Sequence, residues 1–424
     1  MAHIDNIADL YTAFEECTCV TTDSRNISPG AMFFALRGAS FDGNRFACAA
    51  LDNGAAYAVV DSDLPASERP DLAERLLRVE DSLTALQHLA GEHRERLAMP
   101  IIAIVGSNGK TTTKELVKRV LAEQFEIYAT HGNLNNHIGV PLTLLAMTRD
   151  TQFGIVEMGA SSCGEIATLC NIARPNYGLI TNIGRSHLEG FGGVEGIRRG
   201  KGELFDWLER NGGRAFVPQE DEVLMEMASE RENMAVEYYS RSIADGYESH
   251  LFGKYNRANI AAAVEVGRYF DIDSERIATA IAGYTPDNNR SQEMMTEREN
   301  RLIIDCYNAN PSSMTAAIEN VEETEHEHKM LILGDMLELG EWSMAEHCNI
   351  LRLALSSSCK EILLVGENFG RALEQVDVDT EVEVHHFATT DAAAEYLKEE
   401  APKEAMILLK ASRGIALERL INLL

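Results

Sequence analysis

A glycine-rich turn between an apolar run and an amphipathic stretch constrains the fold of this chain more than any other feature. The apolar run at 101–105 reads Ile-Ile-Ala-Ile-Val and is typical of a buried strand. The turn that follows is Gly106-Ser107-Asn108-Gly109-Lys110-Thr111-Thr112. In the stretch 112–125, one helical face carries Leu116, Val117, Val120, Leu121 and Phe125. The order strand, glycine loop, helix predicts a phosphate-binding loop, because backbone N–H groups and the helix N-terminus both favour anions.

Two side chains at the end of this turn have the chemistry of nucleotide binding. Lys110 is expected to reach the β- and γ-phosphates, and the Thr111 hydroxyl is expected to ligate Mg²⁺. The spacing is short, since Ser107 and Asn108 alone separate the glycines where the common P-loop has four residues. The alternative is a chance glycine turn before a helix. The two flanking elements and the Gly-Lys-Thr-Thr core favour the nucleotide site.

Three more side chains follow predicted strands or lie near them. Glu157 ends the run 153–157, and His187 comes shortly after the run 178–182. Ligands of parallel sheets gather outside the carboxyl ends of the strands, so Glu157 is expected to face the magnesium of the P-loop. The alternatives are a surface carboxylate for Glu157, a structural histidine for His187 and a solvated helix lysine for Lys201.

Apolar runs alternate with longer helical stretches through most of the chain. In the last third the runs are 302–305, 330–333, 362–365, 382–387 and 406–409. Such alternation predicts a mostly parallel sheet covered on both faces, of Rossmann-like type although no G-x-G-x-x-G follows the first strand. Further strands are expected at 153–157, 178–182 and 214–217, and a helix at 256–270. We therefore predict an α/β protein of three domains, at 1–82, 83–291 and 292–424, with a hinge at 285–290.

The charge balance restricts the partners. The chain has 38 Lys plus Arg against 67 Asp plus Glu, a net charge of −29, so nucleic acid and anionic membranes are unfavourable partners. The last domain has 11 basic and 26 acidic residues, a balance of −15, and the central one has 21 and 27, a balance of −6. An anionic ligand must therefore be held by local positive groups.

Composition also predicts the compartment. The first twenty residues are too acidic for an apolar signal segment, and no run approaches 18 apolar residues. Eight cysteines are too few for a disulfide scaffold, and Cys17 and Cys19 form a lone C-x-C without metal-ligand spacing. We expect a cytoplasmic protein with reduced thiols and no membrane insertion.

Taken together, these motifs and their order resemble the Mur ligase family, ATP-dependent enzymes that add amino acids to the peptidoglycan precursor. The resemblance covers all three domains and implies an N-terminal UDP-sugar domain, a central ATP domain and a C-terminal Rossmann-like ligase domain. It implies that Glu157 and His187 bind two Mg²⁺ ions together with Lys201, carbamylated by CO₂. It also places Asn256 and Asn259 near adenine, with Arg290 and Asp305 near the ribose or phosphates. The alternative for the two asparagines is helix capping.

Within the family, four segments resemble the members that join D-alanyl-D-alanine to UDP-N-acetylmuramoyl-tripeptide. They are 132–143, 187–192, 201–205 and 305–311. The members that add the third residue usually carry D-N-P-[RK], which this sequence lacks. The resemblance implies substrate contacts at Ser24, Arg25, Arg37, Asn135, Asn136, Tyr307 and Asn308, with the loop 409–414 as a further candidate for the dipeptide pocket. A guanidinium suits a diphosphate, although either arginine is equally a surface residue, and Asn44 replaces the family's usual His.

The activity implied is an amide ligase that passes through an acyl phosphate and releases ADP and phosphate. Its catalytic residues would be Lys110, His187 and Lys201. Its partners would be ATP, the UDP-linked tripeptide and D-alanyl-D-alanine, and the protein would be a monomer. The alternatives are the sister ligase that adds lysine or diaminopimelate, a folylpolyglutamate synthase, a P-loop GTPase switch and a nucleotide sensor with a decayed site. The sequence has no Asn-Lys dipeptide and hence no N-K-x-D guanine motif, and it retains every catalytic residue type, which disfavours the last two.

Overall fold

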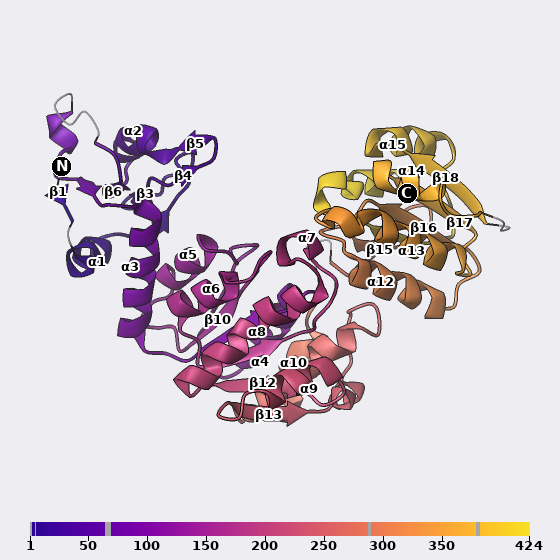
Figure 1. The fold of residues 1–424 in the computed structure, drawn as a ribbon, viewed down its shortest axis with the longest axis horizontal. Coiled ribbons are helices and arrows are strands. Elements are labelled where there is room, and N and C mark those ends of the chain that lie inside the picture. Colours follow the sequence, from indigo (N-terminus) through magenta and orange to yellow (C-terminus); the bar gives the residue numbers. More distant parts are fainter. Residues whose placement is uncertain (1, 5, 64–68, 287–289, 379–381) are drawn as a thin grey trace.

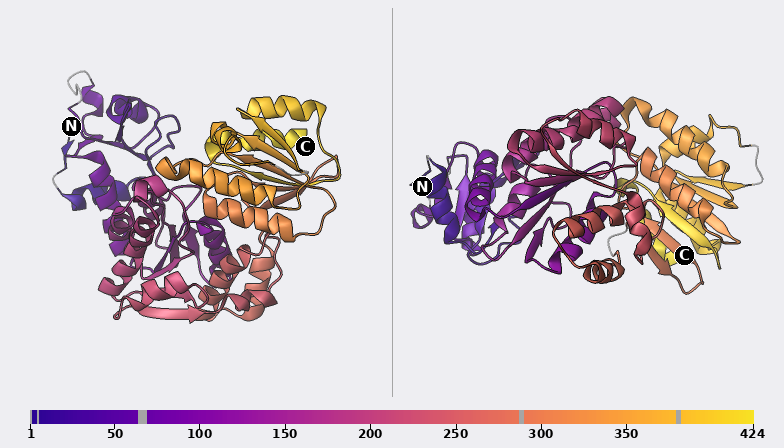
Figure 2. Two further views of the ribbon diagram at one scale, coloured as in Figure 1. Left: turned by 45° about the vertical axis from the view of Figure 1, so that its right-hand side comes forward. Right: turned by 90° about the horizontal axis from the view of Figure 1, so that it is seen from below.

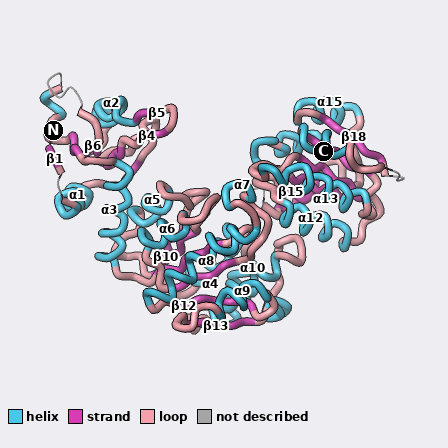
Figure 3. The backbone as a smooth tube through the Cα atoms, viewed as in Figure 1, coloured by secondary structure: helices cyan, strands magenta, loops and turns pink. Residues whose placement is uncertain are grey.

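The chain folds into three parts, each built around its own β-sheet (Figure 1). In the computed structural model, the described residues are 2–4, 6–63, 69–286, 290–378 and 382–424. The N-terminal part lies on one side of the central part and the C-terminal part on the other, as two further views also show (Figure 2). Helices flank the strands of every part (Figure 3). The predicted fold class of three α/β units is confirmed, whereas the domain limits at 82/83 and 291/292 stay predictions.

The N-terminal part has a parallel sheet in the order β1-β7-β6-β3-β2. Its strands are β1 (Ala2–His3), β2 (Val20–Thr21), β3 (Met32–Phe34), β6 (Tyr57–Val60) and β7 (Leu76–Arg78), with the hairpin β4 (Arg37–Gly38) and β5 (Phe41–Asp42) beside it. Its helices are α1 (Ile7–Glu15) and α2 (Ala47–Asp52), with 3₁₀ turns at Gly43–Phe46 and Pro70–Leu72. Successive residues of β3 enter different cores, because side chains alternate across a strand: Phe33 packs over α2, while Met32 and Phe34 join the core shared with the central part.

One helix connects the first sheet to the second. α3 (Ser82–Leu97) begins where the Asp81 side chain accepts a hydrogen bond from Thr84 N, and it ends at Ala98 in the left-handed conformation. Leu86 and Leu89 of this helix belong to a core that also contains residues of α1 and of the central sheet. The N-terminal part is therefore packed onto the central part rather than tethered to it.

The central sheet is wholly parallel, in the order β13-β12-β11-β8-β10-β9. Its strands are β8 (Ile101–Val105), β9 (Ile127–Ala129), β10 (Phe153–Glu157), β11 (Tyr177–Ile180), β12 (Arg214–Pro218) and β13 (Ala235–Tyr239). Its helices are α4 (Lys110–Ala122), α5 (Gly139–Leu145), α6 (Glu165–Ala173), α7 (Leu188–Phe191), α8 (Val194–Asn211), α9 (Glu222–Ser229), α10 (Asn256–Tyr269) and α11 (Ser274–Ala282), with a 3₁₀ segment at Arg241–Gly246. Ile102 and Ile104 face α4 and α10, and the alternate residues of β8 face α3, α5, α6 and α8.

The C-terminal sheet has the order β14-β15-β19-β16-β17-β18 and is parallel except for the pair β14–β15. Its strands are β14 (Gln292–Met295), β15 (Arg301–Asp305), β16 (Lys329–Gly334), β17 (Glu361–Val365), β18 (Glu383–Phe387) and β19 (Met406–Lys410). Its helices are α12 (Pro311–Glu323), α13 (Ser343–Leu355), α14 (Glu367–Leu373) and α15 (Thr390–Glu399), with 3₁₀ segments at Gly340–Trp342, Arg413–Ile415 and Leu417–Leu423. All five predicted runs of this part are strands.

One strand and one helix differ from their predicted bounds by two or more residues at an end. The strand expected at 178–182 ends at Ile180, because Asn182 instead bonds to the phosphate loop. The helix expected from Thr112 begins at Lys110, directly after a left-handed Gly109, and it ends at Ala122.

The predicted hinge at 285–290 includes 287–289, which lie outside the described residues. Among the described helices, none combines the length and apolarity that crossing a membrane requires.

Candidate functional site

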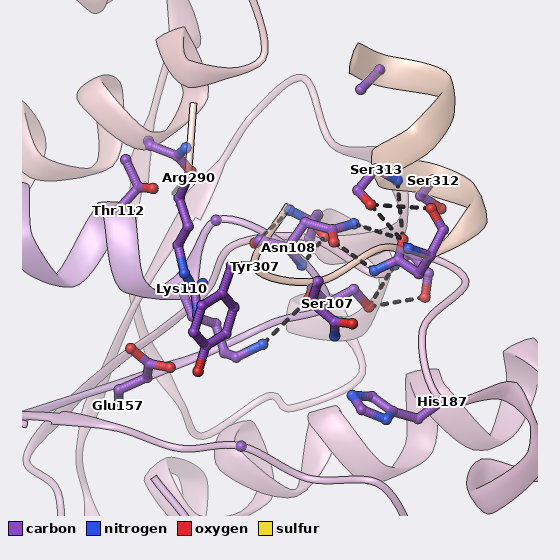
Figure 4. A pocket seen from close by; sticks show the side chains of 18 of the residues that line it. Ser107, Asn108, Lys110, Thr112, Glu157, His187, Arg290, Tyr307, Ser312 and Ser313 are labelled. Carbon is purple, nitrogen blue, oxygen red and sulfur yellow. Dashed lines mark hydrogen bonds between the residues drawn. The ribbon is translucent and has the colours of Figure 1, made fainter. Parts of the chain in front are cut away.

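A cavity of about 730 Å³ lies where the carboxyl ends of the central strands meet the C-terminal part (Figure 4). The central part contributes the glycine loop after β8, the end of β10 and the start of α10. The C-terminal part contributes the residues after β15, the start of α12 and the turn after β16. The cavity thus needs both parts, as expected for a site at the carboxyl edge of a parallel sheet.

The glycine loop has a backbone that only glycine accommodates. Gly106 and Gly109 have φ of 149° and 78°. A Cβ at Gly106 would lie 1.9 Å from Thr181 Oγ1, and one at Gly109 would lie 2.4 Å from Asn259 Oδ1. The loop is anchored from β11 onward, since Ser107 N donates to the Asn182 carbonyl (3.1 Å). The predicted loop is therefore a rigid turn placed directly before a helix N-terminus.

Lys110 lies across this turn. Its Nζ donates to the carbonyl oxygens of Gly106 (2.7 Å) and Ser107 (3.2 Å). Burial lowers the pKa of the ammonium group, and the nearby Glu157 carboxylate opposes that shift. Asn108 and Thr112 also line the cavity. Lys110 is thus positioned at the mouth of the loop, where a phosphate would replace the carbonyl contacts.

Glu157 is a buried carboxylate and not a surface one. It is 2% exposed at the end of β10, where Oε2 accepts from Thr111 Oγ1 (2.9 Å) and Oε1 accepts from Asn135 Nδ2 (2.8 Å). Its backbone N–H donates to Thr130 Oγ1 (3.0 Å). The alternative of an exposed carboxylate is wrong, because the parallel pairing of β10 with β8 places the end of this strand beside the glycine loop.

The oxygens of Thr111 and Glu157 fit a hard divalent cation. They are adjacent, both are buried, and Mg²⁺ prefers oxygen ligands with phosphates completing the shell. Among the described residues, no cluster of three His, Cys, Asp or Glu side chains is arranged as a metal site of its own. A cation here would therefore share its shell with a phosphate ligand.

Lys201 is also buried, which excludes the solvated-lysine interpretation. It is 2% exposed on α8, and its Nζ donates to the Gly106 carbonyl (3.2 Å). Burial first, and then the charge of Lys110, holds the pKa of Lys201 well below its usual value. Within the described ranges no carboxylate forms an ion pair with this ammonium group. Burial thus favours the neutral amine over the ammonium form, and the neutral amine is the form that reacts with CO₂.

His187 lies immediately before α7 with φ of +52°, which is uncommon outside glycine. Its Nδ1 contacts the carboxylate of Glu338, which comes from the turn after β16, and the two form an ion pair only when the imidazole is protonated. Burial lowers the pKa of the imidazole, and the Glu338 carboxylate acts against that shift. Figure 4 shows His187 across the site from Arg290, on the same side as Ser107.

Asn256 and Asn259 support the glycine loop from α10. Thr113 Oγ1 donates to Asn259 Oδ1 (3.1 Å), and Asn259 Nδ2 donates to Asn256 Oδ1 (2.8 Å). The capping alternative is wrong, because Tyr255 occupies the N-cap position and makes no capping side-chain bond. Both asparagines line the cavity, and their role near adenine stays a prediction.

Arg290 and Asp305 approach the cavity from the C-terminal side. The Arg290 guanidinium lies 3.7 Å from the centre of the Tyr307 ring, an arrangement also visible in Figure 4. Asp305 Oδ2 accepts from Lys410 Nζ (2.5 Å), and Lys410 is 1% exposed. Asn308 lines the same wall. These four predicted positions, Arg290, Asp305, Tyr307 and Asn308, are therefore brought together.

Sequence reasoning missed residues that join the two parts. Asn310 Nδ2 donates to Asn108 Oδ1 (2.7 Å), and Arg185 N donates to Ser312 Oγ (2.9 Å). The Arg185 guanidinium also forms an ion pair with Glu346 (2.8 Å). One signal was available, because Asn310 precedes Pro311 as an N-cap precedes a proline at the first helical position.

The N-terminal candidates lie apart from this cavity. Arg25 forms an exposed ion pair with Asp23, and Arg37 forms one with Asp61 (2.9 Å). Ser24 is half-buried next to Arg25. Asn44 is buried, and its amide donates to Asp42 and Asp61 (both 2.8 Å), so it has a structural role in this part.

Asn136 lies between the main cavity and a second one nearer the N-terminal part. It lines the main cavity and a second one of about 330 Å³, which also includes Gln87 of α3 and His137. Asn135, by contrast, donates a hydrogen bond to Glu157. The roles predicted for Ser24, Arg25, Arg37 and the two asparagines as substrate contacts stay predictions.

Comparison with known proteins identifies the family. Residues 104–248 match the Mur ligase middle domain, 289–413 the glutamate ligase domain of Mur ligases, and 16–94 the catalytic domain of the Mur ligase family. The UDP-N-acetylmuramoyl-tripeptide--D-alanyl-D-alanine ligase of Bacillus subtilis (strain 168) is 34% identical, over 95% of this chain and 92% of the relative.

Two solved structures have the same fold. MurF from Acinetobacter baumannii superposes with a TM-score of 0.84 at 29% identity, covering 98% of both chains. The MurF ligase of Thermotoga maritima, solved in complex with ADP, superposes with a TM-score of 0.82 at 24% identity, covering 97% of both chains. With all three parts matched in order and the phosphate-loop site assembled, this chain belongs to the Mur ligase family.

Proposed function

We propose that this chain joins D-alanyl-D-alanine to UDP-N-acetylmuramoyl-tripeptide, with ATP converted to ADP and phosphate. The observation that carries the proposal is the shared cavity, which is lined by Lys110, by Glu157 with its hydrogen-bond partner Thr111 behind it, and by residues of the C-terminal part. The central part provides a phosphate site on one wall of the cavity, and the C-terminal part provides the opposite wall. This arrangement suits a reaction in which a carboxylate is first activated by phosphate transfer and an amine then binds and reacts. The full-length similarity to the Bacillus ligase supports the choice of substrates.

The chemistry requires activation, because a carboxylate cannot expel oxide. In the first step a carboxylate oxygen of the tripeptide bonds to the γ-phosphorus, and the bond from that phosphorus to the bridging oxygen breaks, releasing ADP. In the second step the dipeptide ammonium group gives one proton to solvent, and its nitrogen then bonds to the acyl carbon. The bond from that carbon to the phosphate oxygen breaks, phosphate leaves with the electron pair, and the nitrogen gives a second proton to solvent as the amide forms. The Lys110 ammonium offsets the repulsion between the two anions of the first step, and the loop N–H groups hold the phosphates.

We further propose that two Mg²⁺ ions bind here. Thr111 and Glu157 would hold one, and His187 with Lys201 as its carbamate would hold the other. Bound there, the ions would neutralise charge on the transferring phosphoryl group. The support is the buried, adjacent oxygen pair and the buried lysine of lowered pKa.

The three parts divide the substrates in this proposal. Residues 1–82 bind the UDP-sugar, 83–291 bind ATP, and 292–424 bind the dipeptide. One chain supplies both walls of the cavity, which supports a monomer. The eight free cysteines support a cytoplasmic location, where ATP and a UDP-linked precursor are present.

The test is ADP release with each substrate omitted in turn. We expect turnover only with ATP, the UDP-linked tripeptide and D-alanyl-D-alanine together, and a loss of at least about 100-fold in Lys110→Ala, since the charge stabilisation of phosphoryl transfer is removed. The exposed Lys118 of α4 provides the control, and Lys118→Ala should keep full activity. Turnover with lysine or diaminopimelate on the UDP-linked dipeptide would assign the sister reaction, and glutamate addition to a folate would assign the folylpolyglutamate synthase reaction.

A further inference from the structure

We propose that Glu338 binds the ammonium group of the acceptor dipeptide, and so selects an amine at the second step. This inference rests on the function proposed above. Glu338 lies on the turn between β16 and the 3₁₀ segment at Gly340–Trp342, lines the main cavity and contacts His187 across the boundary between the two parts.

The backbone around Glu338 is held in an unusual conformation. Glu338 has φ of +62°, in the left-handed region that residues with a Cβ rarely adopt. Three hydrogen bonds hold the preceding residues: Asp335 N donates to the Val365 carbonyl (3.0 Å), Met336 N to His347 Nε2 (3.0 Å), and Leu337 N to Ser412 Oγ (2.9 Å). A strained residue held by its surroundings is typical of a functional position.

The second observation concerns the carboxylates of the cavity. Four line its described part, and three have partners unrelated to an incoming ligand. Glu157 bonds to Thr111 and Asn135, Glu165 to Ser161 and Ser162, and Asp305 to Lys410. Glu338 alone among these four pairs only with an imidazole, and its side chain is 62% exposed.

The charge of the reactants explains why this carboxylate matters. ATP, the UDP-linked peptide and the acyl phosphate are anionic, so a carboxylate facing them is unfavourable unless a cation comes between. The acceptor dipeptide carries an ammonium group before it reacts. Its nitrogen must approach the acyl carbon beside the phosphate loop, and Glu338 reaches that region from the part that also provides Tyr307 and Asn308.

A charged hydrogen bond of this kind predicts a measurable preference. Replacing the ammonium group of the ligand by a hydroxyl, as in D-lactyl-D-alanine, should weaken binding to the unmodified enzyme about 10- to 100-fold. The same replacement should make little difference once the carboxylate is gone. The preference for an amine over a hydroxyl therefore depends on the interaction between the ligand's ammonium group and Glu338.

The experiment compares the KM of D-alanyl-D-alanine and the inhibition constant of D-lactyl-D-alanine in the unmodified enzyme, Glu338→Gln and Glu341→Gln. Glu341 is an exposed glutamate three residues later and serves as the matched control. We expect Glu338→Gln to raise the dipeptide KM about 10- to 100-fold, with the KM values of ATP and the UDP-linked tripeptide unchanged, and to remove the preference for the amine. Glu341→Gln should match the unmodified enzyme in every constant.

Three results would overturn the inference. If the ratio of the dipeptide KM to the inhibition constant of D-lactyl-D-alanine is unchanged in Glu338→Gln, the carboxylate does not bind the ammonium group. A fall in kcat with every KM unchanged would assign Glu338 to domain closure, and an altered Mg²⁺ requirement would assign it to the metal. If the unmodified enzyme fails to use D-alanyl-D-alanine at all, the proposed function fails first, and the two failures are thereby distinguished.

Discussion

Lys201 is an amine buried beside the phosphate loop without a carboxylate ion pair in the described ranges. If it works as a carbamate, Lys201→Ala should lower kcat by at least about 100-fold, because an anionic metal ligand is lost. Short carboxylates such as acetate should partly restore turnover by filling the space. The measurement is ADP release with and without added carboxylate.

A second readout is independent of activity. Enzyme prepared with isotopically labelled bicarbonate should show a carbamate carbon signal that is absent in Lys201→Ala. Near wild-type turnover of Lys201→Ala, or no labelled signal in the unmodified protein, would exclude the carbamate.

At the scale of elements, the start of α12 has two roles that can be separated. The Asn310 side chain accepts from Ser313 N (3.0 Å) as the helix cap, and its amide nitrogen donates to Asn108 of the phosphate loop (2.7 Å). Asn310→Ala should lose both, with a stability cost of about 1 kcal/mol from the missing cap. Asn310→Ser should keep the cap and lose only the bridge.

We therefore expect thermal unfolding to distinguish the two variants while turnover does not. Asn310→Ala should unfold at a lower temperature than Asn310→Ser, and both should have reduced kcat, because the link between loop and helix is broken in each. If Asn310→Ser has full activity, the bridge is not needed for closure, and the helix cap is the whole role of this residue.

At the scale of the molecule, buried histidines in two parts set the response to acid. His93 Nδ1 is hydrogen-bonded to the Tyr11 hydroxyl (3.0 Å), and His347 Nε2 accepts from Met336 N, so His347 is held neutral. Burial lowers the pKa of both; for His347 the Ser343 carbonyl and the carboxylates of Asp335 and Glu346 act in the opposite direction.

The sign of the pH effect follows from these lowered pKa values. As pH falls below about 6.5, the unfolded chain binds protons that the folded protein does not, so the free energy of unfolding decreases. Each histidine contributes at most about 1.4 kcal/mol per pH unit, until the pH falls below its folded pKa. Above pH 6.5 the stabilisation is fully present.

We expect the unfolding temperature of the C-terminal part to fall between pH 7 and pH 5, and His347→Gln to reduce that slope. The exposed His88→Gln should leave the slope as it is. Calorimetry across this range is the measurement, and an identical slope in His347→Gln would show that this residue is not the group that titrates.

Some features of the fold and the site could be predicted from the sequence, and others could not. Local signals were enough for the glycine loop, the strands of the last third and the α/β class, since turn chemistry and side-chain periodicity act over a few residues. Strand ends were less certain, as Ile180 shows, because Asn182, two residues beyond it, bonds to a loop more than 70 residues earlier. The burial of Glu157 and Lys201 followed from the pairing of strands and the packing of α8, not from their neighbours in sequence.

The sequence by itself determined the phosphate loop, the order of the three α/β parts and the residue types that carry the chemistry. Only the tertiary structure decided that Asn310 bonds to Asn108, 202 residues away, and that Glu338 faces His187 from another part. The physical reason is that such contacts depend on how separately formed sheets pack together. That packing leaves no period or spacing in the sequence around either residue.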